Sequence, residues 1–194
     1  MTDKKCLELL EEFGSPLYVF DDKAFVENYN HLSKAFRKEY ENYVLGYSYK
    51  TNYTPHICKL VKSQGGYAEV VSDMELYVAK KIGYENNKII YNGPCKGEMM
   101  EEHILNGGIS NIDNEAETLR VIKLAKRYSD KELKVGLRIN TDIGAGFVSR
   151  FGIETDSKII DRVVAMIKAQ PNLKLVGLHM HVSRARYIEA WQKR

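Results

Sequence analysis

Short apolar stretches alternate with longer amphipathic stretches along most of this 194-residue chain. Residues 23–39 carry Phe25, Tyr29, Leu32 and Phe36 at steps of three and four, which is the spacing of one helix face. After this helix, β-rich stretches are separated by helical patterns of about ten to fourteen residues. The predicted strands read YVLGYSYK, YAEVVS, KIIYNG, ISNID, LKVGLRIN and LKLVGLHMHV.

Residue types at the expected helix ends support this division. Ser72 precedes Asp73 and Glu75, which is the arrangement of an N-cap followed by an acidic first turn. Gly83 and Gly107 stand where a left-handed residue would end a helix. Each strand and helix together span about 20 to 30 residues, so successive strands should lie parallel through right-handed crossovers. The sequence therefore predicts an α/β layered protein.

A parallel alternation can close into a (β/α)8 barrel or remain an open doubly wound sheet. The six predicted strands are two short of a closed barrel. An open sheet fits the count, but no GxGxxG turn follows the first strand, and the GAG at 144–146 lacks the third glycine. The pattern alone leaves both architectures open.

Composition narrows the class of protein. An apolar fraction of 44% is enough for one substantial core, and the net charge of +3 comes from an even mixture of acids and bases, which argues against a nucleic-acid partner. Cys6, Cys58 and Cys95 lack the spacing of a disulfide framework or a zinc site, so we expect a reducing cytoplasm. No apolar run approaches the ~18 residues of a membrane span, so no membrane partner is expected.

Chemically reactive side chains stand where the predicted strands end. They are Lys50, Glu69 with Ser72, Asn92, Asp113, Arg138 with Asn140, and His179 with His181. Because carboxyl ends of parallel strands meet on one side of a sheet, these residues should surround one site. Strand alternation places Gly46, Ser48 and Lys50 on one face. Partial desolvation there would lower the pKa of Lys50 from about 10.4 and make its amine a nucleophile toward an aldehyde.

The stretch YSYKTN resembles the YAxKAN signature of the fold-type III enzymes that use pyridoxal 5'-phosphate (PLP). This group includes alanine racemase and the diaminopimelate, ornithine and arginine decarboxylases. From Gly14 onward, further segments follow the order of the diaminopimelate decarboxylase branch: GSPLYVFD, AEVVSDMEL, IIYNGPCKGEMMEEHILNGGISNIDNEAE, LRIN, RFGI and GLHMHV. The resemblance implies the (β/α)8 TIM barrel of the alanine racemase-like type, incomplete here with about six units and without the family's C-terminal β domain.

The same resemblance implies roles for individual residues. Lys50 would form the Schiff base with PLP, and His181 would stack on the pyridine ring. Glu69 stands where the family usually has an aspartate, followed by the matching Ser72, and Arg138 matches a strand-end arginine near the active site. Ser183 would help to hold the phosphate, although HVSR departs from the family's HxGS.

The implied reaction is decarboxylation of a diamino acid, with meso-diaminopimelate giving L-lysine as the first choice and ornithine, lysine or arginine as alternative substrates. The complete enzyme would be a homodimer. We divide the chain into an N-terminal helix and strand, residues 1–22, and a partial PLP-binding barrel, residues 23–194. Uncovered sheet edges in an unclosed barrel predict that the chain is oligomeric.

Two other classes of function remain open. The chain could be a non-catalytic PLP carrier or a regulatory homologue that keeps the lysine. Alternatively, His179 and His181 could be the HxH pair of a metal-dependent barrel hydrolase. Such a metal site needs further ligands at strand ends, whereas His31, His56 and His103 fall within helical patterns.

Overall fold

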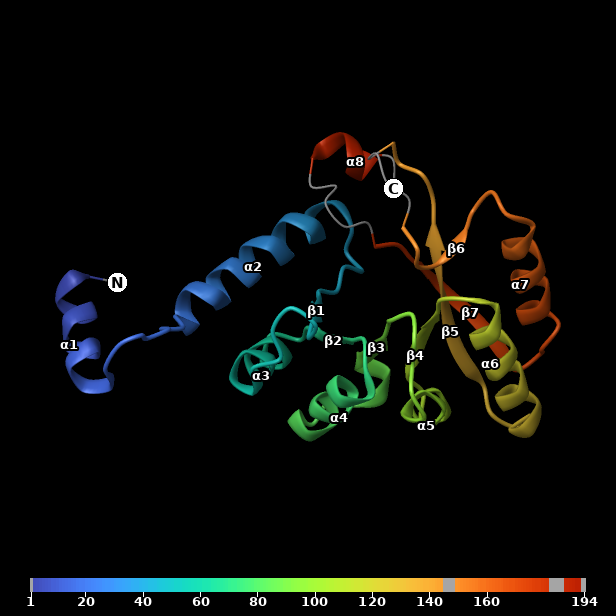
Figure 1. The fold of residues 1–194 in the computed structure, drawn as a ribbon, viewed down its shortest axis with the longest axis horizontal. Coiled ribbons are helices and arrows are strands. Elements are labelled where there is room, and N and C mark those ends of the chain that lie inside the picture. Colours follow the sequence, from blue (N-terminus) through green and yellow to red (C-terminus); the bar gives the residue numbers. More distant parts are fainter. Residues whose placement is uncertain (1, 145–148, 182–186, 193–194) are drawn as a thin grey trace. The chain divides into compact units, whose positions relative to one another are not determined.

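The computed structural model describes residues 2–144, 149–181 and 187–192, and the chain forms two compact units, Met1–Tyr43 and Val44–Arg194 (Figure 1). These compact units meet after Tyr43, and the expected division of the chain after residue 22 stays a prediction. The first unit contains helix α1 (Asp3–Phe13) and helix α2 (Asp22–Glu39). The amphipathic pattern of residues 23–39 is thus confirmed as a helix.

The strand expected within residues 1–22 does not form, and its only β-rich segment is GSPLYVF. Residues 16–21 have no regular secondary structure, and the side chain of Tyr18 is 98% exposed. A β-strand needs a neighbouring strand for its backbone hydrogen bonds, and no described strand pairs with this segment. The β-rich composition of the segment is therefore not sufficient to make it a strand here.

The second unit is built on a parallel sheet, and all six predicted strands of this sheet are confirmed. They are β1 (Gly46–Ser48), β2 (Tyr67–Val70), β3 (Ile89–Tyr91), β4 (Ile109–Ile112), β5 (Leu133–Asn140) and β7 (Leu173–His179). Neighbouring strands pair in sequence order from β1 to β5, and β7 pairs with β5. A short strand that we did not predict, β6 (Ile153–Glu154), pairs with the end of β5.

Helices connect the strands and cover the sheet. They are α3 (Pro55–Ser63), α4 (Asp73–Ile82), the 3-10 turn η1 (Asn86–Lys88), α5 (Met99–Leu105), α6 (Glu115–Arg127) and α7 (Lys158–Lys168), with α8 (Ile188–Gln192) near the C-terminus. Helix α3 packs against α4, α4 against α5, and α6 against α7 (Figure 1). Each crossover therefore places its helix beside the previous one, as right-handed β/α units do.

The start and end of α4 are fixed by local hydrogen bonds, as the sequence predicts. Ser72 Oγ accepts a hydrogen bond from Glu75 N at 3.3 Å, and Glu75 Oε2 accepts one from Val71 N at 2.8 Å. Gly83 ends the helix with a φ of 93°, in the left-handed region that glycine adopts without strain. Helix α6 begins with the same pattern, because Asn114 Oδ1 accepts a hydrogen bond from Glu117 N at 2.9 Å.

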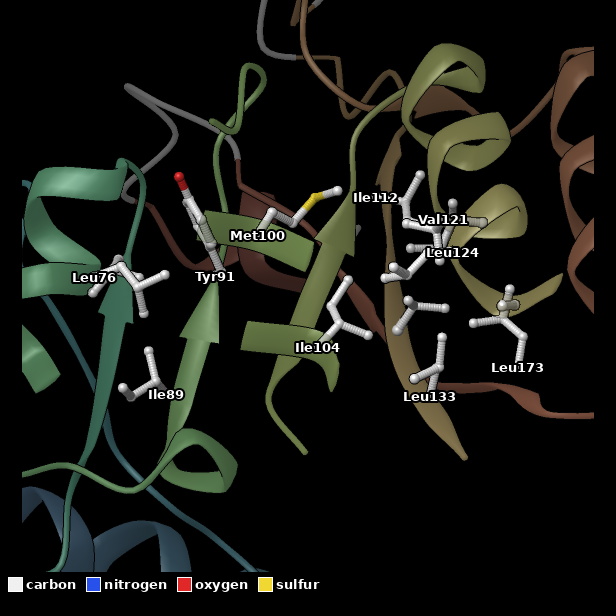
Figure 2. Packing of buried hydrophobic residues seen from close by; sticks show 14 of the residues in the cluster. Leu76, Ile89, Tyr91, Met100, Ile104, Ile112, Val121, Leu124, Leu133 and Leu173 are labelled. Carbon is white, nitrogen blue, oxygen red and sulfur yellow. The ribbon is translucent and has the colours of Figure 1, made fainter. Parts of the chain in front are cut away.

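One apolar core lies between the strands and these helices, as Figure 2 shows. Its side chains include Leu76 from α4, Tyr91 from β3, Met100 from α5, Ile112 from β4 and Leu133 from β5. Burial of such side chains stabilises each by about 1.5–3 kcal/mol relative to exposure. The core thus holds the helices against the paired strands.

The outer strand β7 is less covered than the central strand β5. Val176 and Leu178 in β7 are 46% and 67% exposed, whereas β5 is buried over nearly its whole length. Among the described residues, β1 pairs only with β2 and β7 only with β5. The two outer strands of this sheet therefore each leave one edge without a described neighbour.

Candidate functional site

A cavity of about 1100 Å³ opens at the carboxyl ends of the strands. Strands β1 to β5 and β7 all contribute to its wall, through residues of the strand or of the loop that follows it. The charged and polar lining residues are Ser48, Lys50, Thr51, Glu69, Asn92, Asn111, Arg138, Ser149, Arg150, His179 and His181. The structure therefore brings together most of the strand-end residues that the sequence singles out.

The face of β1 that carries Lys50 is the one predicted. Gly46, Ser48 and Lys50 line the cavity, whereas Tyr49 is fully buried on the other side. Thr51 Oγ1 donates to Ser48 O at 2.7 Å, which fixes the turn after the strand. Lys50 itself is exposed, so the predicted desolvation of its amine is wrong for the described structure. The short residues around it leave its amine accessible from the cavity.

A row of polar side chains crosses the floor of the cavity. Asn92 Nδ2 donates to Glu69 Oε1 at 2.7 Å, and Asn111 Nδ2 donates to Asn92 Oδ1. Asn92 and Asn111 are buried, so their amides hold the Glu69 carboxylate in one orientation. Sequence reasoning singled out Glu69 and Asn92 but missed Asn111. The available signal was its place inside an apolar strand, because a buried amide there needs a polar partner.

Arg138 connects the cavity to a buried carboxylate. Its Nη1 lies 2.9 Å from Asp113 Oδ1, and Asp113 Oδ2 accepts a hydrogen bond from Gly152 N at 3.3 Å. The Arg138 guanidinium carbon lies 5.0 Å from the centre of the Phe151 ring. Arg138 Nε is buried and has no hydrogen-bond partner within the described residues. This donor is available to an acceptor atom of a bound group.

The two strand-end histidines both line the cavity, as their spacing predicts. Desolvation, together with the positive charge of Arg138, lowers the pKa of His179 to about 4. His179 is therefore neutral at pH 7, and its buried Nδ1 has no hydrogen-bond partner in the described part of the chain. His181 is exposed and lies two residues beyond the end of β7.

Other candidates do not reach the cavity or cannot be placed. Ser72 is absent from the cavity wall, and its hydroxyl instead caps α4. Asn140 Nδ2 donates to Ser149 O at 2.6 Å, so it anchors the loop after β5. Ser183 lies outside the described residues.

The described residues offer His179 and His181 no further metal ligands, which the alternative of a metal-dependent hydrolase would require. Within residues 2–144, 149–181 and 187–192, no three His, Cys, Asp or Glu side chains are grouped so that they could share an ion. His31, His56 and His103 lie in α2, α3 and α5, as the sequence indicates. In the same residues, no helix is both long and apolar enough to cross a membrane.

The charge of the cavity wall favours an anionic ligand. Lys50, Arg138 and Arg150 line the cavity with one carboxylate, Glu69. A primary amine beside such a wall suits a group that carries both an aldehyde and an anion. The fold and the site together define a parallel β/α protein with a lysine at the end of its first strand.

Comparison with known proteins identifies the family. Residues 26–192 match the family described as "Pyridoxal-dependent decarboxylase, pyridoxal binding domain". Because this match covers most of the chain, the chain belongs to that family, and the predicted family membership is confirmed.

Curated proteins that are similar to this chain include diaminopimelate decarboxylases. The protein from Methanocaldococcus jannaschii is 32% identical over 193 residues, and the match covers 91% of this chain and 43% of the relative. The protein from Aquifex aeolicus is 30% identical over 186 residues, covering 90% of this chain and 43% of the relative. The chain thus spans less than half the length of these relatives.

Solved structures of related proteins confirm the α/β partial-barrel fold. Diaminopimelate decarboxylase from M. jannaschii aligns with a TM-score of 0.83 and 31% identity, covering 96% of this chain and 46% of that structure. Lysine decarboxylase from Selenomonas ruminantium aligns with a TM-score of 0.72 over 94% of this chain and 46% of that structure. At 22% identity, the second alignment concerns the fold alone.

Proposed function

We propose that this chain is the PLP-binding part of a decarboxylase that converts meso-diaminopimelate to L-lysine. The observation that carries the proposal is the Lys50 amine, accessible from a cavity that also presents Glu69, Arg138 and His181. Relatives about 30% identical that are named diaminopimelate decarboxylase support the choice of substrate. A cytoplasmic location agrees with three cysteines that form no disulfide.

The residues of the cavity fit PLP. Lys50 Nζ would bond to the aldehyde carbon, and the unpartnered N–H at Arg138 Nε would donate to an oxygen of the cofactor. Glu69, held by Asn92, supplies a fixed negative charge, and His181 would lie against the ring as the family resemblance implies. When bound, PLP supplies the electron sink that a decarboxylation requires.

The protein's own task is then to bind and orient. The cationic side chains of Arg138 and Arg150 attract a substrate carboxylate or the cofactor phosphate to the cavity. Neutral His179 adds no charge at pH 7, and its imidazole can donate or accept only one hydrogen bond at each nitrogen. Lys50 Nζ would also take up the proton that the incoming substrate amine gives up.

Replacing Lys50 with alanine is expected to abolish covalent attachment of PLP. The chain is mixed with PLP, reduced with borohydride and digested, and the modified peptide is located by mass spectrometry. The wild-type chain should carry the modification on Lys50. Lys59→Ala, which removes an exposed lysine of α3 outside the cavity, is the control and should keep it. Equal modification of the wild type and Lys50→Ala would contradict the assignment.

Substrate choice needs a separate measurement. CO2 release from meso-diaminopimelate is compared with release from lysine, ornithine and arginine, and we expect meso-diaminopimelate to be preferred. If another of these amino acids is preferred, the protein is a decarboxylase of that amino acid instead. If PLP attaches at Lys50 and the complete protein releases CO2 from none of these amino acids, the result would indicate a carrier or regulatory homologue.

We also propose that the chain is oligomeric, with a homodimer as the state of the complete enzyme. One edge of β7 has no neighbour among the described strands, and this edge with the exposed Val176 and Leu178 would be an aggregation hazard unless another chain covers it. Light scattering at several protein concentrations is expected to give a mass above that of one 22.3 kDa chain. A monomeric mass at all concentrations would contradict this expectation.

A further inference from the structure

A buried ion pair lies behind the cavity without lining it. Lys96, in the segment between β3 and α5, places its Nζ 2.7 and 2.9 Å from the two carboxylate oxygens of Glu117. The same Nζ donates to Gly93 O at 2.7 Å. The side chains of Lys96 and Glu117 are 0% and 9% exposed. Both charges are therefore removed from water and neutralise each other.

Hydrogen bonds continue from this pair to the cavity. Glu117 Oε2 also accepts from Asp113 N at 2.9 Å. The Asp113 carboxylate then binds Arg138 through one oxygen and Gly152 N through the other. Arg138 lines the cavity, and Gly152 directly follows lining residues of the loop after β5. One continuous set of contacts thus joins Lys96 to the cavity wall.

Helix capping alone does not require the lysine. In α4, Glu75 accepts a hydrogen bond from Val71 N in the same helix position as Glu117 in α6. Among the described residues, Lys96 is the lysine that is buried, and it does not pair with Glu75. A buried ion pair contributes little net stability, because desolvation of both charges offsets their attraction. The pair therefore calls for an explanation other than stability.

We propose that Lys96 and Glu117 are positioning residues for the candidate site. Glu117, oriented by Lys96, holds the backbone of Asp113, and the Asp113 carboxylate then sets the Arg138 guanidinium and the Gly152 amide. The role toward PLP rests on the proposed function, whereas the positioning of Arg138 does not. Partners behind a binding residue commonly change ligand affinity by about 10- to 100-fold when removed, as at metal sites.

Three variants separate positioning from stability. Lys96→Met leaves the Glu117 carboxylate buried and unpaired, so both the melting temperature and PLP affinity should fall. Lys96→Met/Glu117→Gln removes both charges but keeps an oxygen that can accept from Asp113 N, so both quantities should recover. Lys96→Met/Glu117→Met removes both charges and that acceptor. Its melting temperature should recover in part, while its Kd for PLP stays about tenfold or more above the wild-type value.

A core variant provides the matched control. Leu124→Ala removes a buried side chain of α6 that takes no part in these contacts, so it should lower the melting temperature and leave the Kd for PLP unchanged. The Kd is measured by absorbance titration at a temperature where every variant is folded. A wild-type Kd in Lys96→Met/Glu117→Met, or Kd values that follow melting temperature in all variants including Leu124→Ala, would overturn the proposal.

The NMR resonance of the Arg138 Nε–H group tests positioning without the cofactor. It should shift in Lys96→Met/Glu117→Met and stay in place in Lys96→Met/Glu117→Gln and in Leu124→Ala. If the wild-type chain fails to bind PLP, the proposed function fails, and this resonance still decides the positioning of Arg138. An unchanged resonance in Lys96→Met/Glu117→Met would refute that positioning.

Discussion

Gly136→Ala is expected to destabilise the chain by about 3 kcal/mol, from overpacking and from a lost buried hydrogen bond. Gly136 is the register partner of Asn111 across β4 and β5. A Cβ on Gly136 would overlap Asn111 Oδ1 and lie 2.9 Å from its Cγ. Because Asn111 donates to Asn92, the displaced amide would leave a buried acceptor without its donor.

The same substitution should weaken PLP binding. Asn111 donates to Asn92, and Asn92 donates to the Glu69 carboxylate at 2.7 Å. Displacement of Asn111 should therefore also displace Asn92 and Glu69 at the floor of the cavity. Urea unfolding gives the change in the free energy of unfolding, and absorbance titration gives the Kd for PLP. We expect a lower unfolding midpoint with an unchanged slope, and a higher Kd.

Gly177→Ala is the matched control for Gly136→Ala. Gly177 pairs with Gly136 across β5 and β7, yet a Cβ at Gly177 would meet no atom within 4 Å. Alanine there should change stability by no more than about 0.5 kcal/mol. Equal effects of the two substitutions would show that strand glycine itself, and not the space beside Asn111, determines the result.

Much of the fold follows from the sequence because each β/α unit carries local signals. The Ser72 to Glu75 cap and the left-handed Gly83 mark the limits of α4, and strand alternation places Lys50 and Tyr49 on opposite faces. These features depend on residues close together in the chain. Local hydrogen bonding and period-two alternation are sufficient to predict them.

Features that depend on distant partners could not be predicted in this way. β6 is two residues long and exists because it pairs with the end of β5. The segment GSPLYVF has the composition of a strand and lacks a described neighbour, so it forms none. Composition shows that a segment can form a strand, whereas pairing decides whether it does.

The residues of the candidate site also fall into those that the sequence could predict and those that it could not. Reactive side chains at strand ends, such as Lys50 and Arg138, could be selected because parallel strands bring their carboxyl ends together. The supporting contacts of Lys96, Glu117 and Asn111 could not, because they join residues 19 to 21 positions apart across different elements. Ser72 matches the family motif, and in the structure its hydroxyl caps α4 and is not among the groups that line the cavity.

Acid is expected to destabilise the fold through His103 before most carboxylates are protonated. His103 is fully buried, and its ring nitrogens lie 3.1 Å from Asn86 Oδ1 and 3.3 Å from Ile109 O. Desolvation lowers the pKa of His103 to about 4, against about 6.5 for a histidine in an unfolded chain. Between these two values the unfolded state binds the proton more readily than the folded state.

The free energy of unfolding should therefore fall as the pH falls from about 6.5 toward 4, and His103 should contribute about 3 kcal/mol to the loss. His179, whose pKa is also lowered to about 4, should act in the same direction. Urea unfolding between pH 7 and pH 4.5 measures the slope. His103→Gln removes the titrating group and should flatten it, whereas His31→Gln, on the exposed surface of α2, should not. Because both variants share any contribution from carboxylates, the difference between their slopes isolates the buried imidazole, and equal slopes would contradict its lowered pKa.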